Sequence, residues 1–323
     1  MAVASAPGKV ILVGEHFVVR GARALVAAVG LRAKVRAARR PGWPVVIEST
    51  RLGLRGEVGP DLELRGPGEL EPLAAVLRAL RRLGVEPVPA EVRVGGDLPP
   101  GAGLGSSAAV TAAAALAYSA LAGVELGPGE LFEAALEGER VVHERPSGVD
   151  TAIAVHGGVL LYRRGGEPQR LGLSLPGGTV LVVADSGVKR RTGDVVRHVL
   201  SRAALTEPAS GLVYRAADAL VDLALEAMGS GDAERLGAAF DLAHGLLAGL
   251  GASSPDLDRI VHAARGAGAY GAKLTGAGWG GSAIALAPAG AAGRVACAMI
   301  RAGAAWAGPV EVGVEGARLE AVE

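Results

Sequence analysis

Apolar residues recur along the chain with two different periods, and these periods divide it into predicted helices and strands. Spacings of three and four residues predict helices at Leu70–Leu83, Pro128–His143, Leu212–Met228, Ala233–Leu250, Pro255–Ala264 and Ala291–Ala302. Short apolar runs predict strands at Val10–Val13, Ala90–Val94, Val155–Tyr162, Gly178–Ala184, Ala272–Thr275, Ser282–Leu286 and Pro309–Val314. Because strands and helices come in blocks and not in strict alternation, the order indicates an α+β fold.

One long stretch, between Asp97 and Glu125, carries no charged residue. It includes a predicted helix at Ser106–Ala122 that is apolar all round, which is typical of a buried helix or of a membrane span. The stretch consists mainly of Ala, Gly and Ser, and Ala contributes little to membrane insertion. We therefore expect a helix buried within a soluble core.

The composition excludes several classes of protein. The 323 residues include 33 basic and 33 acidic ones, and this balance argues against a general nucleic-acid or acidic-membrane binder. Cys297 is the only cysteine, so the sequence holds no disulfide framework and no Cys-rich metal site. Residues Met1–Pro7 also lack the basic stretch that opens a signal peptide. We expect a cytoplasmic protein.

The chain is also poor in side chains that heat damages. It contains no Asn, and Gln169 is its only Gln, which suggests a thermophilic source. A GC-rich genome would produce part of the same bias.

The segment Pro99–Ala108, with the sequence PPGAGLGSSA, leads directly into the predicted buried helix. Glycines let backbone N–H groups approach a ligand closely, and a helix N-terminus that Ser106 or Ser107 could cap favours phosphate. The alternative is a plain glycine-rich turn. A second glycine pattern, Gly276–Gly281, matches the dinucleotide-binding motif in letters, but a predicted strand follows it where that motif requires a helix.

Two acidic residues and a lysine are candidates for chemistry. Glu139 lies on a predicted helix, and Asp150 follows a loop that could bring both carboxylates to one cleft, one to hold Mg²⁺ and one to accept a hydroxyl proton. The alternative is a solvated helix Glu and a turn Asp. Lys9 stands beside Pro-Gly in a chain with few lysines, and Glu15-His16 follows the first predicted strand.

Taken together, three motifs resemble those of the GHMP small-molecule kinases, in the order that family has them. They are Ala6–His16 (APGKVILVGEH), the Pro99–Ala108 segment and Lys273–Gly281 (KLTGAGWGG). The resemblance implies a two-lobed α+β fold, with an N-terminal lobe like the second domain of ribosomal protein S5 and a ferredoxin-like C-terminal lobe. We place the division at residues 1–170 and 171–323.

Within that family the first motif and Pro146–Asp150 are most similar to those of mevalonate kinases, which implies ATP- and Mg²⁺-dependent phosphorylation of the mevalonate 5-hydroxyl. By the same resemblance Asp150 is the catalytic base and Lys9 its electrostatic partner. Ser107 and Glu139 would hold Mg²⁺, and Glu15, His16 and Thr192 would contact the substrate. The residues implied for the ATP phosphates are Pro100, Gly101, Ala102, Gly103, Leu104, Gly105, Ser106 and Ser107.

Two departures keep other substrates open. Trp279 and Ser282 stand where mevalonate kinases usually have Gly and Cys, and a bulky residue before Gly-Gly is closer to galactokinases. The alternatives are therefore a galactose, homoserine or phosphomevalonate kinase, a diphosphomevalonate decarboxylase, or a non-catalytic ligand-binding regulator on the same fold. Dimers are common in the family, so a homodimer is compatible with the resemblance, although no segment indicates an interface.

Overall fold

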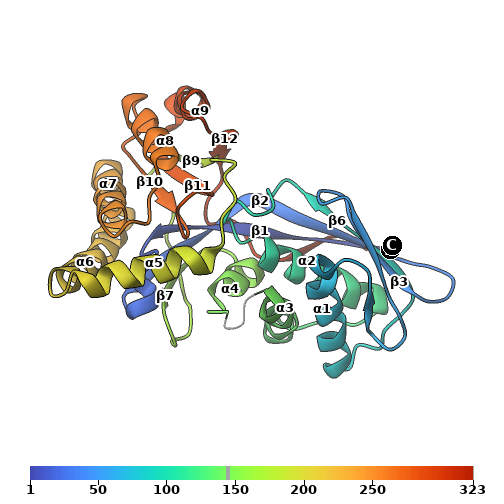
Figure 1. The fold of residues 1–323 in the computed structure, drawn as a ribbon. Coiled ribbons are helices and arrows are strands. Elements are labelled where there is room, and N and C mark those ends of the chain that lie inside the picture. Colours follow the sequence, from blue (N-terminus) through green and yellow to red (C-terminus); the bar gives the residue numbers. More distant parts are fainter. Residues whose placement is uncertain (143–145, 323) are drawn as a thin grey trace.

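The computed structural model describes residues 1–142 and 146–322, and this part of the chain forms two β-sheets with helices packed against them (Figure 1). The first half contains β1 (Ala2–Val13), a 3-10 turn (Phe17–Arg20), β2 (Arg23–Arg39), β3 (Val45–Ser49), β4 (Leu54–Val58), β5 (Leu64–Arg65), a second 3-10 turn (Gly68–Leu70), α1 (Glu71–Arg82), β6 (Ala90–Gly96), α2 (Ser106–Ala122), α3 (Pro128–Val142), α4 (Val149–His156), β7 (Val159–Arg163) and β8 (Gln169–Leu171). The second half contains β9 (Thr179–Asp185), α5 (Thr192–Leu205), α6 (Ala209–Ser230), α7 (Ala233–Gly249), α8 (Pro255–Gly266), β10 (Gly271–Thr275), β11 (Ser282–Pro288), a 3-10 turn (Ala289–Ala291), α9 (Ala292–Arg301), β12 (Trp306–Val310) and β13 (Arg318–Val322).

The larger sheet has the strand order β13-β1-β2-β6-β3-β4-β5, and β7 and β8 extend it from β2. Its pairs are antiparallel except for β3 with β6. The centre is the long pair β1 and β2, whose register shifts between Pro7 and Gly8. The C-terminal strand β13 returns to this sheet and pairs with the start of β1, so the two ends of the chain lie side by side.

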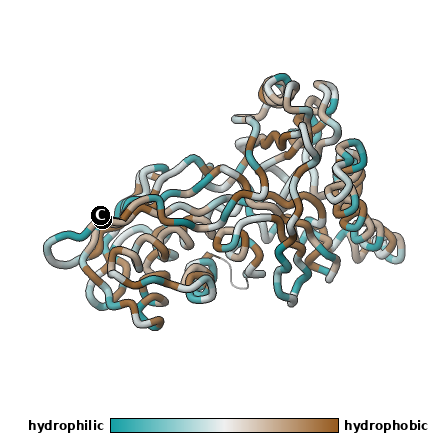
Figure 2. Tube along the Cα trace, turned by 180° about the vertical axis from the view of Figure 1, so that it is seen from behind, coloured by the Kyte–Doolittle hydropathy of each residue, from teal (hydrophilic) through white to brown (hydrophobic). Residues whose placement is uncertain are grey.

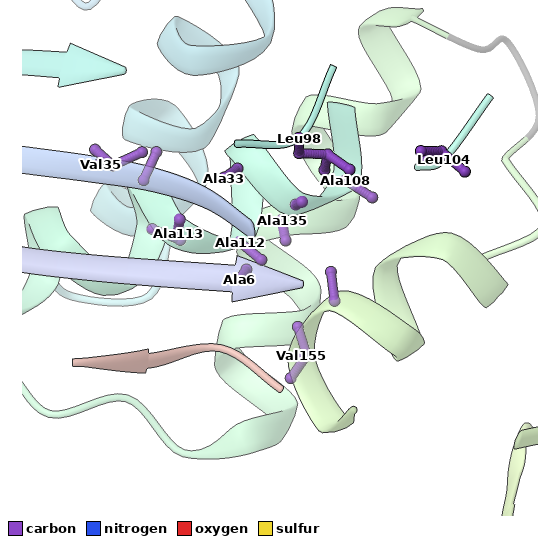
Figure 3. Packing of buried hydrophobic residues seen from close by; sticks show 14 of the residues in the cluster. Ala6, Ala33, Val35, Leu98, Leu104, Ala108, Ala112, Ala113, Ala135 and Val155 are labelled. Carbon is purple, nitrogen blue, oxygen red and sulfur yellow. The ribbon is translucent and has the colours of Figure 1, made fainter. Parts of the chain in front are cut away.

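The helix α2 is buried between this sheet and the other helices. It packs on β1 and β2 and against α1 and α3, and most of its alanines are inaccessible to solvent. Small side chains such as Ala6, Ala33, Ala108 and Ala112 lie close together at this interface (Figure 3). Because Ala leaves room for close backbone packing, the helix is enclosed without charged residues. The predicted buried helix is thus confirmed.

The smaller sheet has the strand order β10-β11-β9-β12, and α7, α8 and α9 pack against it. Its central strands are nearly all buried, which explains why they are runs of apolar residues without alternation. Figure 2 shows hydrophobic segments along the inner strands and hydrophilic ones in outer loops. None of the helices in the described ranges combines the length and apolar character that crossing a bilayer requires.

The α+β architecture is confirmed, and most predicted elements lie where the periodicity placed them. The predicted strand Val155–Tyr162 is wrong at its start, because Val155 belongs to α4 and β7 begins at Val159. Val149, Ala152 and Ile153 are buried at helical spacing, so α4 had a sequence signal. The predicted strand Pro309–Val314 is shifted, since β12 ends at Val310. His143, the predicted end of a helix, lies outside the described residues.

Candidate active site

One cavity of about 280 Å³ gathers most of the predicted site residues where β1, α2, α3 and α4 meet the loops before α5 and β11. Its lining residues are Lys9, Gly101, Gly103, Gly105, Ser106, Ser107, Glu139, Asp150, Arg190, Thr192, Gly276 and Ala277. Figure 1 shows α4 and the near end of α5 on either side of this region. Residues from all three sequence motifs therefore line a single cavity.

Lys9 and Asp150 form an ion pair in this cavity. The Nζ atom of Lys9 lies 3.3 Å from Oδ1 of Asp150, and the Lys9 side chain is 8% exposed and that of Asp150 35%. Lys9 follows the register shift at Gly8, where a Cβ atom would lie 2.9 Å from the Leu104 carbonyl oxygen. Only glycine lets β1 approach the glycine-rich loop this closely. Asp150 is in the first turn of α4, so its carboxylate is held by a helix and not by a flexible turn.

The glycine-rich loop ends at the N-terminus of α2. Gly105, in the left-handed region at φ 72°, precedes the helix, and within the described residues no side chain forms its N-cap. The predicted capping by Ser106 or Ser107 is therefore wrong, because both residues already belong to the first turn. An uncapped helix start leaves N–H groups for an anion, and both serines line the cavity.

Two backbone contacts hold this loop in place. The Leu104 carbonyl oxygen accepts a hydrogen bond of 2.8 Å from the Lys9 backbone N–H, and the Ala102 carbonyl oxygen accepts one of 2.8 Å from the Ser282 hydroxyl. Both Ala102 and Leu104 are buried. These two residues thus anchor the loop, while its glycines and serines line the cavity.

Glu139 and Ser107 fit the metal site that the sequence predicts. Glu139 is 3% exposed and lines the same cavity as the Ser107 hydroxyl. A carboxylate and a hydroxyl are hard oxygen donors of the kind that Mg²⁺ prefers. In the described ranges no three His, Cys, Asp or Glu residues cluster closely enough to hold a metal ion. An ion between Glu139 and Ser107 would complete its coordination with water and phosphate oxygens.

A second, apolar cavity of about 200 Å³ adjoins the first and shares Ser106 and Ser107 with it. The predicted residue Pro100 lines this cavity. Most of its wall is aliphatic and includes Leu70, Leu73, Val94, Leu98 and Val110. Sequence reasoning missed these residues, because each is an ordinary core position of its own helix or strand.

Glu15, predicted to contact substrate, is buried against Lys273. The two side chains are 1% and 0% exposed and form a direct ion pair, and the Lys273 ammonium also donates to the Leu274 carbonyl oxygen at 2.7 Å. Burial raises the pKa of Glu15 and lowers the pKa of Lys273, while the charge of each partner opposes both shifts. The pair joins the loop after β1 to β10, and the substrate contact of Glu15 stays a prediction.

His16 lies directly beside the cavity wall. Its Nε2–H donates to the carbonyl oxygen of Ala277 at 2.7 Å, and Ala277 lines the cavity. Burial lowers the pKa of His16, so the ring is neutral at pH 7. A contact between His16 and substrate stays a prediction, as it does for Thr192, which lines the cavity itself.

Arg190 is a lining residue that sequence reasoning missed. Its Nε–H donates to the Gly278 carbonyl oxygen at 3.0 Å, and burial lowers the pKa of its guanidinium. The guanidinium faces the glycine-rich loop, since a Cβ at Gly103 would lie 2.8 Å from its Nη2. A half-buried cation here suits a phosphate group. Its closeness in sequence to Thr192 was the available signal.

Comparisons with known proteins agree with this geometry. The models of the GHMP kinases N terminal domain and of the GHMP kinases C terminal match residues 72–158 and 203–305. A mevalonate kinase of Aeropyrum pernix is 50% identical over 319 residues, which are 98% of each chain. The crystal structure of L. major mevalonate kinase in complex with R-mevalonate is 30% identical, has a TM-score of 0.79 and covers 97% of this chain and 96% of that one.

The Methanococcus jannaschii mevalonate kinase has a TM-score of 0.84 at 24% identity, over 96% of this chain and 97% of that one, and so shares the fold. The two family models match segments in both halves of the chain, and they include Ser106, Ser107, Glu139 and Asp150. The chain belongs to the GHMP kinase family.

Proposed function

We propose that this GHMP kinase transfers the γ-phosphoryl group of ATP to the 5-hydroxyl of mevalonate, a step of isoprenoid biosynthesis. The observation that carries the proposal is the single cavity that holds Lys9, Asp150, Glu139 and the start of α2. The choice of mevalonate rests on the 50% identity to the Aeropyrum pernix enzyme over nearly the whole chain.

The two adjoining cavities suit the two parts of ATP. The glycine-rich loop and the N-terminus of α2 offer N–H groups to the phosphates, and Arg190 adds positive charge beside them. The apolar cavity beyond Ser106 suits the nucleoside, because a planar base buries apolar surface against aliphatic side chains. Ser106 and Ser107, which both cavities share, would then lie near the junction of the two parts.

In the proposed reaction Asp150 accepts the hydroxyl proton as the substrate oxygen forms its bond to the γ-phosphorus. The bond from that phosphorus to the bridging oxygen breaks, and ADP leaves. Lys9 supplies positive charge beside the reacting oxygen, and its pairing with Asp150 keeps the carboxylate aimed at it. Mg²⁺, when held by Ser107 and Glu139, neutralises charge on the phosphates. Catalysis is then mainly positioning and electrostatics.

On the acceptor side the proposal places Thr192, His16 and Glu15. The two departures that kept galactose open have other partners in the structure. Ser282 hydrogen-bonds the Ala102 carbonyl oxygen and so supports the phosphate loop, and Trp279 bonds to Gly251 outside the lining residues. Neither contact favours galactose over mevalonate.

The test is ADP release from ATP and Mg²⁺ with mevalonate, phosphomevalonate, galactose and homoserine offered separately. We expect turnover with mevalonate alone. Turnover with galactose and not mevalonate would contradict the proposed substrate. Release of CO₂ from diphosphomevalonate would indicate a decarboxylase, and tight ATP binding without ADP release would indicate a regulator.

Three further properties are proposals that accompany this function. We propose a division into lobes at residues 1–170 and 171–323, although β13 pairs with β1 in the first sheet. We also propose a cytoplasmic location and a homodimer. Sedimentation of the purified chain would measure the oligomeric state directly.

A further inference from the structure

Trp279 has a backbone conformation that normally requires glycine. In the loop Gly276–Gly281, glycines at 276, 278, 280 and 281 have positive φ angles, and Trp279 also does, at 56°. The left-handed region costs a bulky L-residue about 1 kcal/mol or more. Such strain persists where the surroundings compensate for it, and it clusters at functional sites. The contacts of the Trp279 side chain therefore need an explanation.

Those contacts join three separate segments. The indole Nε1–H donates to the Gly251 carbonyl oxygen at 2.8 Å, and the backbone N–H donates to the Ala252 carbonyl oxygen at 3.0 Å. The indole also packs on the His198 ring, with centroids 4.9 Å apart and planes tilted by 57°. His198 itself lies over Gly251, where a Cβ would be 2.8 Å from its Nε2. Trp279 thus connects its own loop to α5 and to the end of α7.

The first turns of α5 have a direct relation to the cavity. The helix begins at Thr192, a lining residue, and His198 lies six residues later, about 9 Å along the axis. Arg190, just before the helix, donates to the carbonyl oxygen of Gly278, the neighbour of Trp279. One short loop therefore holds both Arg190 and the aromatic contact to α5.

We propose that Trp279 is a positioning residue for phosphoryl transfer. Through its contact with His198 it holds the first turns of α5, and so keeps Thr192 and Arg190 in place at the cavity. A shift of an ångström at groups that orient substrate can lower turnover about a hundredfold. The inference rests on the proposed function for the identity of the acceptor alcohol, but not for the packing that it describes.

The test compares four single variants and one double variant at a temperature where circular dichroism shows each to be folded. Trp279→Gly removes the indole and suits the positive φ, so we expect kcat/KM for mevalonate to fall about tenfold to a hundredfold without a matching loss of thermal stability. Trp279→Phe keeps an aromatic ring and should recover most of the activity. His198→Ala should reproduce the loss. Trp306→Ala, on the edge strand β12, is the matched control and should behave like wild type.

The double variant Trp279→Gly/His198→Ala separates positioning from general damage. Because both residues act through one contact, we expect it to be no worse than the poorer single variant. Wild-type kcat/KM in His198→Ala, or losses that multiply in the double variant, would overturn the proposal. Absence of mevalonate turnover in the wild type would instead refute the substrate, and the variants would then be compared on whichever alcohol of the panel reacts.

Discussion

The Lys9 ammonium and the Asp150 carboxylate lie 3.3 Å apart, although one residue is on β1 and the other on α4. Lys9 is buried and Asp150 is partly open to the cavity, so the cation is fixed and the carboxylate remains accessible to a substrate. This relationship yields two predictions about the chemical step.

Replacing Asp150 with Asn removes the proposed base and keeps the shape of the side chain. We expect kcat to fall about 10²- to 10⁴-fold, the usual contribution of a general base. Thermal unfolding should change little, because the Asp150 side chain is partly exposed. Asp256→Asn is the matched control, since Asp256 also lies in the first turn of a helix but far along the chain, on α8. Near-normal turnover of Asp150→Asn would refute the assignment of the base.

Replacing Lys9 with Met removes the buried charge and retains the length of the side chain. We expect kcat to fall about 10²-fold or more, as when one preorganised donor is lost from a site of developing charge. The combined Lys9→Met/Asp150→Asn variant should lose less than the product of the single effects, because the two groups act as a unit. Lys34→Met, at an exposed position on β2, should leave kinetics unchanged. Fully multiplicative losses would mean that the ion pair has no role in catalysis.

Glu139→Gln and Ser107→Ala test the predicted metal ligands. Loss of an oxygen ligand weakens metal binding, so the Mg²⁺ concentration for half-maximal activity should rise at least about tenfold. The comparison is Glu137→Gln, on the same helix α3, whose carboxylate pairs with Arg82 and Arg140 at the surface. An unchanged Mg²⁺ requirement in both site variants would place the metal elsewhere. Titration of activity against free Mg²⁺ at saturating ATP measures this directly.

His244 makes the stability of the second lobe depend on pH. Burial, with Arg265 and Lys273 nearby, lowers the pKa of its imidazole from 6.5 to about 4, against the opposing effect of Asp258. The ring is neutral in the folded protein, because its Nδ1 accepts a hydrogen bond from the Leu274 N–H. Between pH 6.5 and 4 the unfolded chain therefore binds more protons than the folded one, so the free energy of unfolding falls as the pH falls.

The expected loss over that window is about 3 kcal/mol, and this contribution is fully present above pH 6.5. His244→Gln supplies an acceptor for Leu274 and cannot titrate, so its unfolding free energy should vary less with pH in denaturant titrations. His262→Gln, at an exposed position on α8, should keep the wild-type slope. Equal slopes in wild type and His244→Gln would show that other groups control acid stability.

Local chemistry was enough to predict much of the fold and part of the site. The buried helix α2, the glycine-rich loop before it and the helices α6, α7 and α8 all follow from spacing, turn residues and helix termini that lie close together in sequence. Asp150, Glu139, Ser107 and Lys9 could be identified as candidates because their motifs combine residue types that suit phosphoryl transfer. The cavity that they line together confirms that they meet, and their individual roles stay predictions.

Other features depend on contacts between distant parts of the chain. Glu15 and Lys273 are 258 positions apart, and only packing between the two sheets removes both from water and pairs them. The same is true of Arg190, whose bond to Gly278 places it in the cavity, and of Trp279 on His198. A side chain's type and its neighbours in sequence determined which chemistry this chain can perform and which segments become helices. Which groups face one another was decided by the tertiary structure alone, because burial and pairing across elements depend on residues that no local pattern brings together.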